Sequence, residues 1–458
     1  MSRRFDAIVV GGGQAGPSLA ARLSGAGMEV ALVERHLLGG TCVNTGCMPT
    51  KALVASAYAA HLARRAGDYG VRIDGPIGVD MAKVTERVQG VASTARGNVE
   101  KWVASMARCT LFRDHARFEA PGTLRVGDET ISAPRIFLNV GGRASVPDMP
   151  GVDEINYLTN TSILQLSEVP RHLIVIGASY IGLEFAQAYR RFGAQVTVIE
   201  KGPRVTARED EDVSSAIQEI LEKEDIAFRL NAECIRFARH PDGVAAGVEC
   251  TDGPPEVVGS HVLLAVGRRP NTDDLGLDAA GVWMDARGYV TVNDKLETNV
   301  PGIWAMGDCN GRGAFTHTSY NDYEIIAANL LDGDDRKVSD RLPCYGLFTD
   351  PPLGRVGLGE AEAKAKGHRI LVGRRPMTRV GRAVEKGEAQ GFMKIVVDAD
   401  SDAILGGTIL GPGGDEAVHA ILDMMQTGRT ADTLRRTVHI HPTVAELIPT
   451  IAGELKPA

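Results

Sequence analysis

The 458-residue sequence has no long apolar run and no surplus of basic residues. A helix needs about 18 consecutive apolar residues to cross a bilayer, and no such stretch occurs, so we expect no membrane span. Lys and Arg total 50 against 58 Asp and Glu, which gives a formal net charge of -8. Because phosphate backbones and anionic lipids attract basic patches, this balance argues against nucleic acid and membrane surfaces as partners.

Cysteine is also scarce, with an odd total of seven residues, which excludes a secreted disulfide framework. The first residues lead directly into a strand-like run and leave no room for a signal peptide, so we predict a cytoplasmic protein. Five cysteines are scattered along the chain, and we interpret them as small buried hydrophobic residues. They are Cys109, Cys234, Cys250, Cys309 and Cys344.

One supersecondary pattern occurs twice. Residues 5–10 are apolar and strand-like, residues 11–16 are a glycine-rich turn, residues 17–26 are helical in pattern, and residues 29–34 are a second strand. The same order of strand, turn, helix and strand returns at 172–176, 177–182, 183–192 and 195–200. Two copies of one βαβ unit are therefore the main organising feature of the chain.

The first turn carries Gly11, Gly13 and Gly16. The first glycine permits the tight turn, the second lets the backbone approach a pyrophosphate, and the third allows close packing of helix on strand. Glu34 ends the following strand, where a carboxylate accepts hydrogen bonds from a ribose diol. Because the motif lies after a strand and before a helix, it predicts a dinucleotide site rather than a merely glycine-rich turn.

The second turn has Gly177 at its start and Ser179 where the central glycine would stand. Serine is small, so a pyrophosphate can still approach the backbone. Glu200 ends the next strand, and a carboxylate there favours NAD because it repels the 2′-phosphate of NADP. Lys201 and Arg204 follow closely and could hold that phosphate, so NAD is favoured and NADP stays open.

Cys42 and Cys47 stand within residues 39–51, Gly-Gly-Thr-Cys-Val-Asn-Thr-Gly-Cys-Met-Pro-Thr-Lys. Their spacing allows a disulfide only if the chain coils, because the Cα atoms must come within about 4.4–6.8 Å. A helical run follows, so Cys47 should lie near a helix N-terminus, where the dipole lowers the pKa of a thiol. We interpret the pair as redox-active; the alternatives are a structural disulfide or two buried cysteines.

The last motif is His439-Ile-His441-Pro-Thr-Val-Ala-Glu446. Pro442 is expected to start a helix, with Glu446 about one turn in. A histidine can move a proton to or from a thiolate near neutral pH, and a carboxylate can orient it. Taken alone, the motif also allows a structural histidine or a His-x-His metal site.

These patterns predict an α/β fold with two Rossmann-like dinucleotide-binding domains and a C-terminal α+β domain. In the C-terminal part, residues 392–397 and 404–410 are predicted strands, and residues 415–427 and 443–452 are predicted helices. The predicted domains are residues 1–150 and 273–342 for the first, 151–272 for the second and 343–458 for the third.

Together, the motifs resemble the class I pyridine nucleotide-disulfide oxidoreductases, a family that includes dihydrolipoamide dehydrogenase, glutathione reductase and mercuric reductase. The resemblance covers essentially the whole chain, and residues 39–51 with His441-Pro-Thr-x-x-Glu446 carry most of it. Residues 298–308 resemble the family's second FAD motif, and residues 348–357 resemble the start of its dimerisation domain.

The resemblance implies FAD and NAD(P)H as cofactors, with NADH slightly favoured, and it implies a role for each motif. Cys47 is expected beside the flavin as the charge-transfer thiolate, and Cys42 is expected to attack the substrate. Lys51 is expected near flavin N5, paired with Glu184, and Tyr180 is expected to cover the nicotinamide side of the flavin.

The resemblance further implies a homodimer in which His441, oriented by Glu446, acts as acid and base on Cys42 of the other subunit. The residues expected at FAD are Gly11, Gly13, Gly16, Glu34, Gly40, Thr41, Lys51, Gly141 and Asp308. The residues expected at NAD(P) are Gly177, Ser179, Tyr180, Ile181, Glu200 and Gly267. No metal site is expected.

The implied activity is an FAD-dependent NAD(P)H:disulfide oxidoreductase acting through the Cys42–Cys47 pair on a small-molecule disulfide. The alternatives are a reductase for Hg(II) or Cu(II), dihydrolipoamide dehydrogenase, and a non-catalytic redox sensor. Strict mercuric reductases carry a C-terminal cysteine pair and lack the histidine, whereas this chain ends without cysteine and has His441. Thr45 and Met48 fit dihydrolipoamide dehydrogenase less well, so an unidentified disulfide is favoured.

Overall fold

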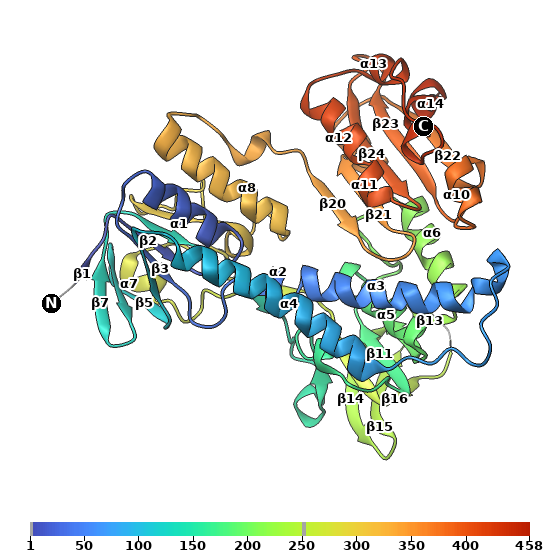
Figure 1. Ribbon diagram of the computed structural model, residues 1–458, viewed down its shortest axis with the longest axis horizontal. Coiled ribbons are helices and arrows are strands. Elements are labelled where there is room, and N and C mark those ends of the chain that lie inside the picture. Colours follow the sequence, from blue (N-terminus) through green and yellow to red (C-terminus); the bar gives the residue numbers. More distant parts are fainter. Residues whose placement is uncertain (1–2, 250–252) are drawn as a thin grey trace.

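The computed structural model describes residues 3–249 and 253–458, except the side chains of residues 234 and 249, and it has three regions built on separate sheets (Figure 1). The first contains the N-terminus, the second is drawn in green, and the third, in red and orange, contains the C-terminus. This arrangement confirms the predicted α/β fold with a separate C-terminal part. The exact domain boundaries stay a prediction.

A five-stranded parallel sheet of order β19-β8-β2-β3-β4 forms the core of the first region. Ala7 and Val9 of β2 belong to one hydrophobic cluster, and Ile8 and Val10 belong to another. Successive side chains of a strand point to opposite faces, so both faces of this sheet are buried, and its strands are continuous apolar runs. The strands are β2 (Ala7–Val10), β3 (Val30–Val33), β4 (Cys109–Phe112), β8 (Ile136–Leu138) and β19 (Ile303–Ala305).

The chain leaves the first region and returns to it, because β19 pairs in parallel with β8. Helix α1 (Ala15–Gly25) connects β2 to β3, as the first glycine motif predicts. A four-stranded sheet flanks this region: β1 (Arg3–Arg4), β5 (Ala116–Ala120), β6 (Thr123–Val126) and β7 (Glu129–Ser132).

The second region repeats the parallel architecture with the order β10-β17-β11-β12-β13. Helix α5 (Tyr180–Phe192) starts three residues before the predicted 183, directly at the glycine turn. An antiparallel sheet packs beside the parallel sheet. Its strands are β14 (Glu233–His240), β15 (Gly243–Glu249) and β16 (Glu256–Gly259). The parallel strands are β10 (Tyr157–Leu158), β11 (His172–Ile176), β12 (Gln195–Ile199), β13 (Ile226–Arg229) and β17 (His261–Leu264). Strands β9 (Gly142–Ala144) and β18 (Arg268–Pro270) pair where the chain passes between the two regions.

The third region is a six-stranded antiparallel sheet of order β20-β21-β24-β23-β22-β25. The predicted helix 415–427 is divided into α11 (Gly414–Ala417) and α12 (His419–Gln426). The strands are β20 (Cys344–Leu347), β21 (Leu353–Gly357), β22 (Ile370–Pro376), β23 (Phe392–Asp398), β24 (Ile404–Leu410) and β25 (Lys456–Pro457).

The predicted helix start at Pro442 is wrong. The Thr443 hydroxyl donates to the backbone oxygen of Ile440 and holds a turn there, a local bond that competes with helix formation. Helical structure begins only at Ala445–Leu447, as one turn of 3₁₀ helix, and continues in α14 (Ile448–Gly453).

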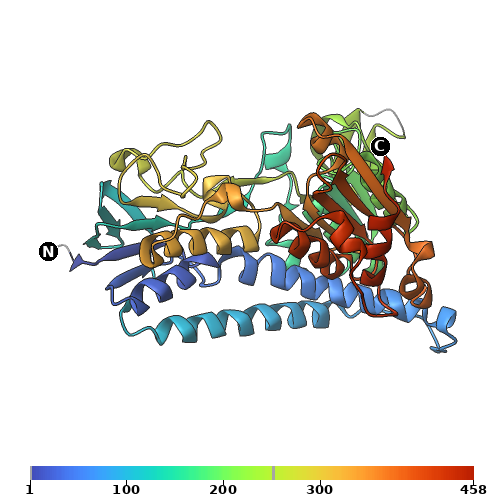
Figure 2. The ribbon, with the colours of Figure 1, turned by 90° about the horizontal axis from the view of Figure 1, so that it is seen from above.

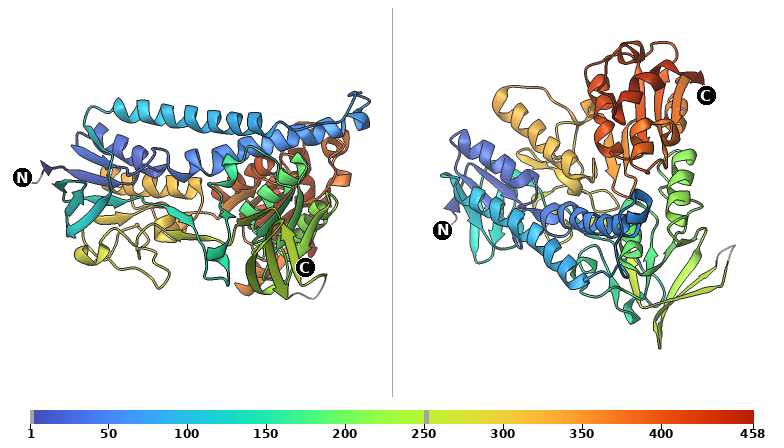
Figure 3. Two further views of the ribbon diagram at one scale, coloured as in Figure 1. Left: turned by 90° about the horizontal axis from the view of Figure 1, so that it is seen from below. Right: turned by 45° about the vertical axis from the view of Figure 1, so that its right-hand side comes forward.

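Two long helices, α3 (Cys47–Arg64) and α4 (Met81–Ala104), lie side by side along the molecule (Figures 2 and 3). Helix α3 starts in the first region, and its buried Leu53 and Ala57 belong to the same cluster as Val175 of β11. One rigid helix therefore joins the two dinucleotide units and places its first residue, Cys47, between them. In the described part of the chain, no helix is both long and apolar enough to cross a membrane.

Candidate active site

A cavity of about 2480 Å³ opens between the three regions. Single ligand pockets measure roughly 300–1,000 Å³, so this cavity has room for two dinucleotides. Gly16 is not among its lining residues; a Cβ there would lie 2.1 Å from the Gly11 oxygen, so it serves close packing. The other predicted cofactor residues line the cavity: Gly11, Gly13, Glu34, Gly40, Thr41, Lys51, Gly141, Gly177, Ser179, Tyr180, Ile181, Glu200, Gly267 and Asp308.

The two strand-end carboxylates are held by the glycine turns that precede them. The Gly12 N–H donates to Glu34 Oε2 at 2.7 Å, and the Ala178 N–H donates to Glu200 Oε2 at 2.8 Å. Each carboxylate therefore lies beside its turn, at the wall of the cavity, as ribose recognition requires.

The cavity fits a flavin dinucleotide in shape and in charge. Among the described residues other than the chain neighbours, no atom lies within 4 Å of a Cβ built at Gly141, in the predicted FAD site, or at Gly267, in the predicted NAD(P) site. The space beside both glycines is therefore free of side chains. Asp308 follows β19 and lines the same cavity, where burial raises the pKa of its carboxyl. Arg268 Nε lies 3.6 Å from Asp308 Oδ2, which keeps a positive charge beside this hydrogen-bond acceptor.

Cys42 and Cys47 lie together at one wall of the cavity as free thiols. Cys42 is in the short helix α2 (Gly40–Asn44), and Cys47, predicted to lie near a helix N-terminus, is the first residue of α3. A hydrogen bond from the Cys42 thiol lowers the pKa of Cys47 to about 6, with help from Thr316, whose Oγ1 lies 3.4 Å from Cys47 Sγ, and from Lys51. The same contact raises the pKa of Cys42. The pair is thus divided into a thiolate, Cys47, and a thiol, Cys42.

Lys51 and Glu184 form an ion pair across the cavity wall, with Nζ and Oε2 2.7 Å apart. Glu184 is only 5% exposed, and its other oxygen accepts a hydrogen bond from the Phe348 N–H at 3.0 Å. Lys51 Nζ also lies 4.4 Å from the centre of the Phe348 ring. The Lys51 ammonium is therefore held by Glu184 and Phe348, two residues distant from it in the sequence.

Tyr180 is half-buried at the cavity wall, and its hydroxyl donates to Glu209 Oε1 at 2.9 Å. Burial raises the pKa of Tyr180, so the phenol stays protonated. The Tyr345 hydroxyl donates to the same oxygen at 2.7 Å. Sequence reasoning missed Glu209, Tyr345, Thr316 and Phe348, because no spacing or motif links them to the residues they contact.

His441 lies outside the cavity of its own chain. Its side chain is 81% exposed, and its Nδ1 lies 2.8 Å from Glu446 Oε2. Val438 and Ile440 beside it are 97% and 80% exposed. Exposed apolar residues in one segment are typical of a surface that another chain covers. A single chain therefore pairs His441 with Glu446 but does not bring it to Cys42.

The prediction that the scattered cysteines are buried is confirmed only for Cys309. Cys109 and Cys344 are half-buried, because each starts a strand at the edge of its sheet. Cys250 and the side chain of Cys234 lie outside the described residues.

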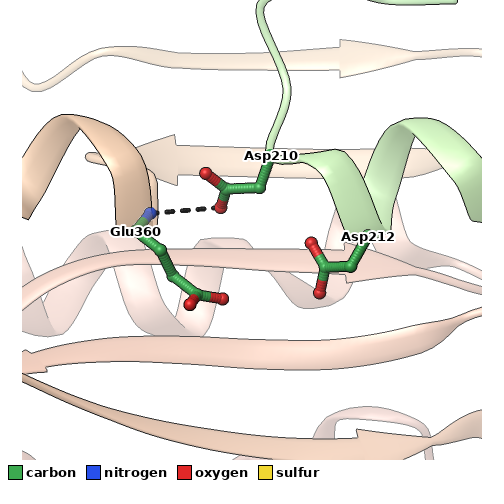
Figure 4. A group of neighbouring side chains, drawn as sticks. All are labelled: Asp210, Asp212 and Glu360. Carbon is green, nitrogen blue, oxygen red and sulfur yellow. Dashed lines mark hydrogen bonds between the residues drawn. The ribbon is translucent and has the colours of Figure 1, made fainter. Parts of the chain in front are cut away.

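Three carboxylates, of Asp210, Asp212 and Glu360, approach one another between the second and third regions (Figure 4). Lys394 on β23 has its Nζ 3.0, 2.9 and 2.7 Å from oxygens of these three groups. The lysine side chain is only 1% exposed. A buried ammonium therefore occupies the position that a cation would need, and the cluster is an ionic contact between regions.

Comparison with known proteins agrees with this geometry. Residues 5–322 match the family model described as pyridine nucleotide-disulphide oxidoreductase, and residues 344–452 match its dimerisation domain. The chain is 32% identical over 448 residues to a dihydrolipoyl dehydrogenase of Thermus scotoductus, covering 97% of this chain and 96% of the relative. It is 31% identical over 444 residues to a mercuric reductase of Bacillus cereus, covering 96% and 70%.

A solved structure is similar over the same length. It is described as the Cu(II) complex of the HOCl-induced flavoprotein disulfide reductase RclA from Escherichia coli. It superposes with a TM-score of 0.90 at 31% identity and covers 99% of both chains.

Proposed function

We propose a reaction from one premise: this chain belongs to the pyridine nucleotide-disulphide oxidoreductase family and is an FAD-dependent oxidoreductase that uses a pyridine nucleotide. In this reaction, electrons pass from NADH to FAD, then to Cys42 and Cys47, and finally to a small-molecule disulfide. The observation that carries the proposal is the thiolate–thiol pair at the wall of a cavity that both glycine turns line.

The chemistry of the two sulfurs follows from their unequal acidity. The Cys42 thiol, once deprotonated, attacks one sulfur of the substrate disulfide, and the other sulfur leaves as a thiolate that takes up a proton. The Cys47 thiolate then attacks Cys42 and releases the second substrate thiol. This step re-forms the Cys42–Cys47 disulfide, so one substrate disulfide is reduced for each pair of electrons.

Cys42 needs a base because its pKa is raised. We assign that role to His441 of the partner subunit, with Glu446 holding its Nδ1. Support comes from the match of residues 344–452 to a dimerisation domain and from the exposed Val438 and Ile440. The active site would then be complete only in a homodimer.

When bound, FAD would supply two-electron transfer between the nicotinamide and the disulfide. The first turn, Glu34 and Asp308 would hold it, and Lys51 would place a positive charge beside it. The second turn and Glu200 would hold NADH. Glu200 favours NADH because its carboxylate would face the 2′-phosphate of NADPH. A cytoplasmic location, predicted from the sequence, belongs to the same proposal.

The test is the visible spectrum of the FAD-loaded dimer after addition of two reducing equivalents. We expect a long-wavelength band from the Cys47 thiolate beside oxidised flavin, and we expect Cys47→Ser to lose it while Cys309→Ser keeps it. Because the pKa of Cys47 is about 6, the band should weaken as the pH falls through that value. A band that survives in Cys47→Ser overturns the assignment.

A second candidate function is reduction of a metal ion as substrate. It is favoured by the similarity to a flavoprotein whose structure contains Cu(II) and to a mercuric reductase. NADH oxidation that depends on Cu(II) or Hg(II), and that Cys42→Ala abolishes, would support it. Simple inactivation by the metal would reject it. Turnover with lipoamide would instead identify a dihydrolipoamide dehydrogenase.

A further inference from the structure

Glu209 is a buried carboxylate that accepts hydrogen bonds from two tyrosines of the cavity. Its side chain is 0% exposed, and its Oε1 accepts from Tyr180 at 2.9 Å and from Tyr345 at 2.7 Å. The rings of the two tyrosines lie 5.5 Å apart, centre to centre. Tyr180 comes from the second region and Tyr345 from the third, so the carboxylate joins two regions at the cavity wall.

The rest of the carboxylate is poorly satisfied. Glu209 Oε2 has no hydrogen-bond partner among the described residues, and the guanidinium of Arg355 stays 4.0 Å away. A buried charge is stabilised chiefly by its hydrogen bonds, so each remaining donor counts more as their number falls. Among the described residues, movement of the Tyr180 hydroxyl would leave the Glu209 carboxylate with Tyr345 as its one hydrogen-bond donor, and this loss resists the movement.

Contacts on both sides of Glu209 hold its backbone in place. The Thr206 N–H donates to the Ala178 oxygen at 2.8 Å, and the Glu209 N–H donates to the Thr206 oxygen at 2.8 Å, which ties the loop to the second glycine turn. The next residue, Asp210, is bound by the buried Lys394 of the third region. The carboxylate is therefore a fixed point against which the Tyr180 ring is held.

We propose that Glu209 is a positioning residue that latches Tyr180 over the nicotinamide site, so that NADH must break this hydrogen bond to bind. The inference rests on the proposed function, because it takes Tyr180 as the residue that the nicotinamide displaces. A latch reduces the fraction of protein that is competent to bind, and the apparent dissociation constant rises by the same factor.

The experiment measures the apparent Kd for NADH from the concentration dependence of flavin reduction in rapid mixing. Tyr180→Phe keeps the ring and removes the hydroxyl, and Glu209→Gln removes the charge. We expect Tyr180→Phe to lower the apparent Kd roughly three- to tenfold, the size of one hydrogen bond, and Glu209→Gln to lower it less, because an amide oxygen still accepts from the phenol. The double variant should show no more than the Tyr180→Phe effect, because both changes act on the same bond. Glu211→Gln, an exposed glutamate two residues away, is the matched control and should leave the Kd unchanged.

Independent effects that multiply in the double variant, or an unchanged Kd in Tyr180→Phe, overturn the latch. Thermal unfolding of the same proteins distinguishes the latch from a merely structural role of Glu209. In a structural role, Glu209→Gln would lower the thermal stability equally whether residue 180 is Tyr or Phe, and the Kd for NADH would not change. If Glu209→Gln does not fold, Tyr180→Phe still decides the question. A normal thiolate band with no coupling rejects the latch alone, whereas a missing band rejects the proposed function.

Discussion

At residue 11 and again at residue 177 the chain makes the same left-handed turn, with φ of 109° and 104°. A Cβ at Gly11 would lie 2.2 Å from the Asn139 oxygen, and one at Gly177 would lie 2.5 Å from the Ala265 oxygen. Both oxygens directly follow a neighbouring parallel strand, β8 or β17. Each turn thus combines a positive φ with a close backbone approach, which only glycine allows.

The carboxylates that follow the turns are held alike as well. Glu34 also accepts from the His36 N–H at 2.7 Å, and Glu200 also accepts from the Gly202 N–H at 2.8 Å. With the bonds to the turns, each carboxylate has one backbone donor on each oxygen. The two units therefore repeat one backbone design almost atom for atom.

The surroundings of the two units differ. Behind the first turn the chain continues to Cys42 and Cys47, whereas behind the second it continues to Glu209 and the ionic contact with Lys394. The two units therefore share one backbone design but differ in the segments that follow it.

Gly11→Ala and Gly177→Ala should have the largest effects, because each disrupts one of the two turns. Each combines backbone strain of about 1–3 kcal/mol with overpacking of similar size. We expect Gly11→Ala to be purified without FAD. Gly177→Ala should keep FAD and its thiolate band on chemical reduction but lose reduction by NADH. Absorbance spectra and rapid mixing measure both, and loss of the same ligand by both variants would contradict the assignment of the two turns.

Lys394→Met tests whether the second unit depends on the third region. Removing the buried ammonium leaves three carboxylates together, and loss of one partner of a buried ion pair costs about 3–5 kcal/mol. We expect a lower urea midpoint and weaker NADH binding, with FAD retained. Lys366→Met is the control, because Lys366 pairs with Glu362 at the surface and its side chain is 54% exposed. Equal loss of stability in both variants would show that the buried ion pairs of Lys394 contribute no more than the surface pair of Lys366.

Glu34→Gln and Glu200→Gln test whether the two carboxylates recognise different nucleotides. A charged acceptor is replaced by a neutral one, and one backbone donor loses its partner, which costs about 1.5–3 kcal/mol. We expect Glu34→Gln to weaken FAD alone. Glu200→Gln should raise the ratio of kcat/KM for NADPH over NADH by about tenfold, because the repulsion of the 2′-phosphate is removed. Steady-state kinetics with both nucleotides measures it, and an unchanged ratio would remove Glu200 from the choice of cofactor.

Ser179→Gly makes the second turn resemble the first and should have the smallest effect. Ser179 is exposed, and its side chain forms no capping hydrogen bond. We expect the free energy of NADH binding to change by less than about 0.5 kcal/mol, which corresponds to about a twofold change in KM for NADH. The reverse change, Gly13→Ser, should weaken FAD more, since a Cβ there would meet Asn139 Nδ2 at 3.3 Å. Equal effects would mean that the two turns tolerate side chains alike.

Much of this arrangement could be predicted from local patterns. The glycine turns, their strands and their terminal glutamates depend on residues close in sequence, so spacing located them. The position of Cys47 near a helix N-terminus was also predicted correctly, because a helical run follows it in the sequence. The helix start predicted at Pro442 was wrong, because a single turn held by the Thr443 hydroxyl precedes the helix.

The two βαβ units, the cysteine pair and the family could be recognised from the amino-acid sequence, because each depends on residues within a short stretch. The side chains that surround them could be identified only in the folded chain. Thr316 at Cys47, Phe348 at Lys51 and Glu209 at Tyr180 are long-range contacts, and no periodicity encodes which distant loop a cavity wall will meet. Their positions follow from the packing of three regions around one cavity.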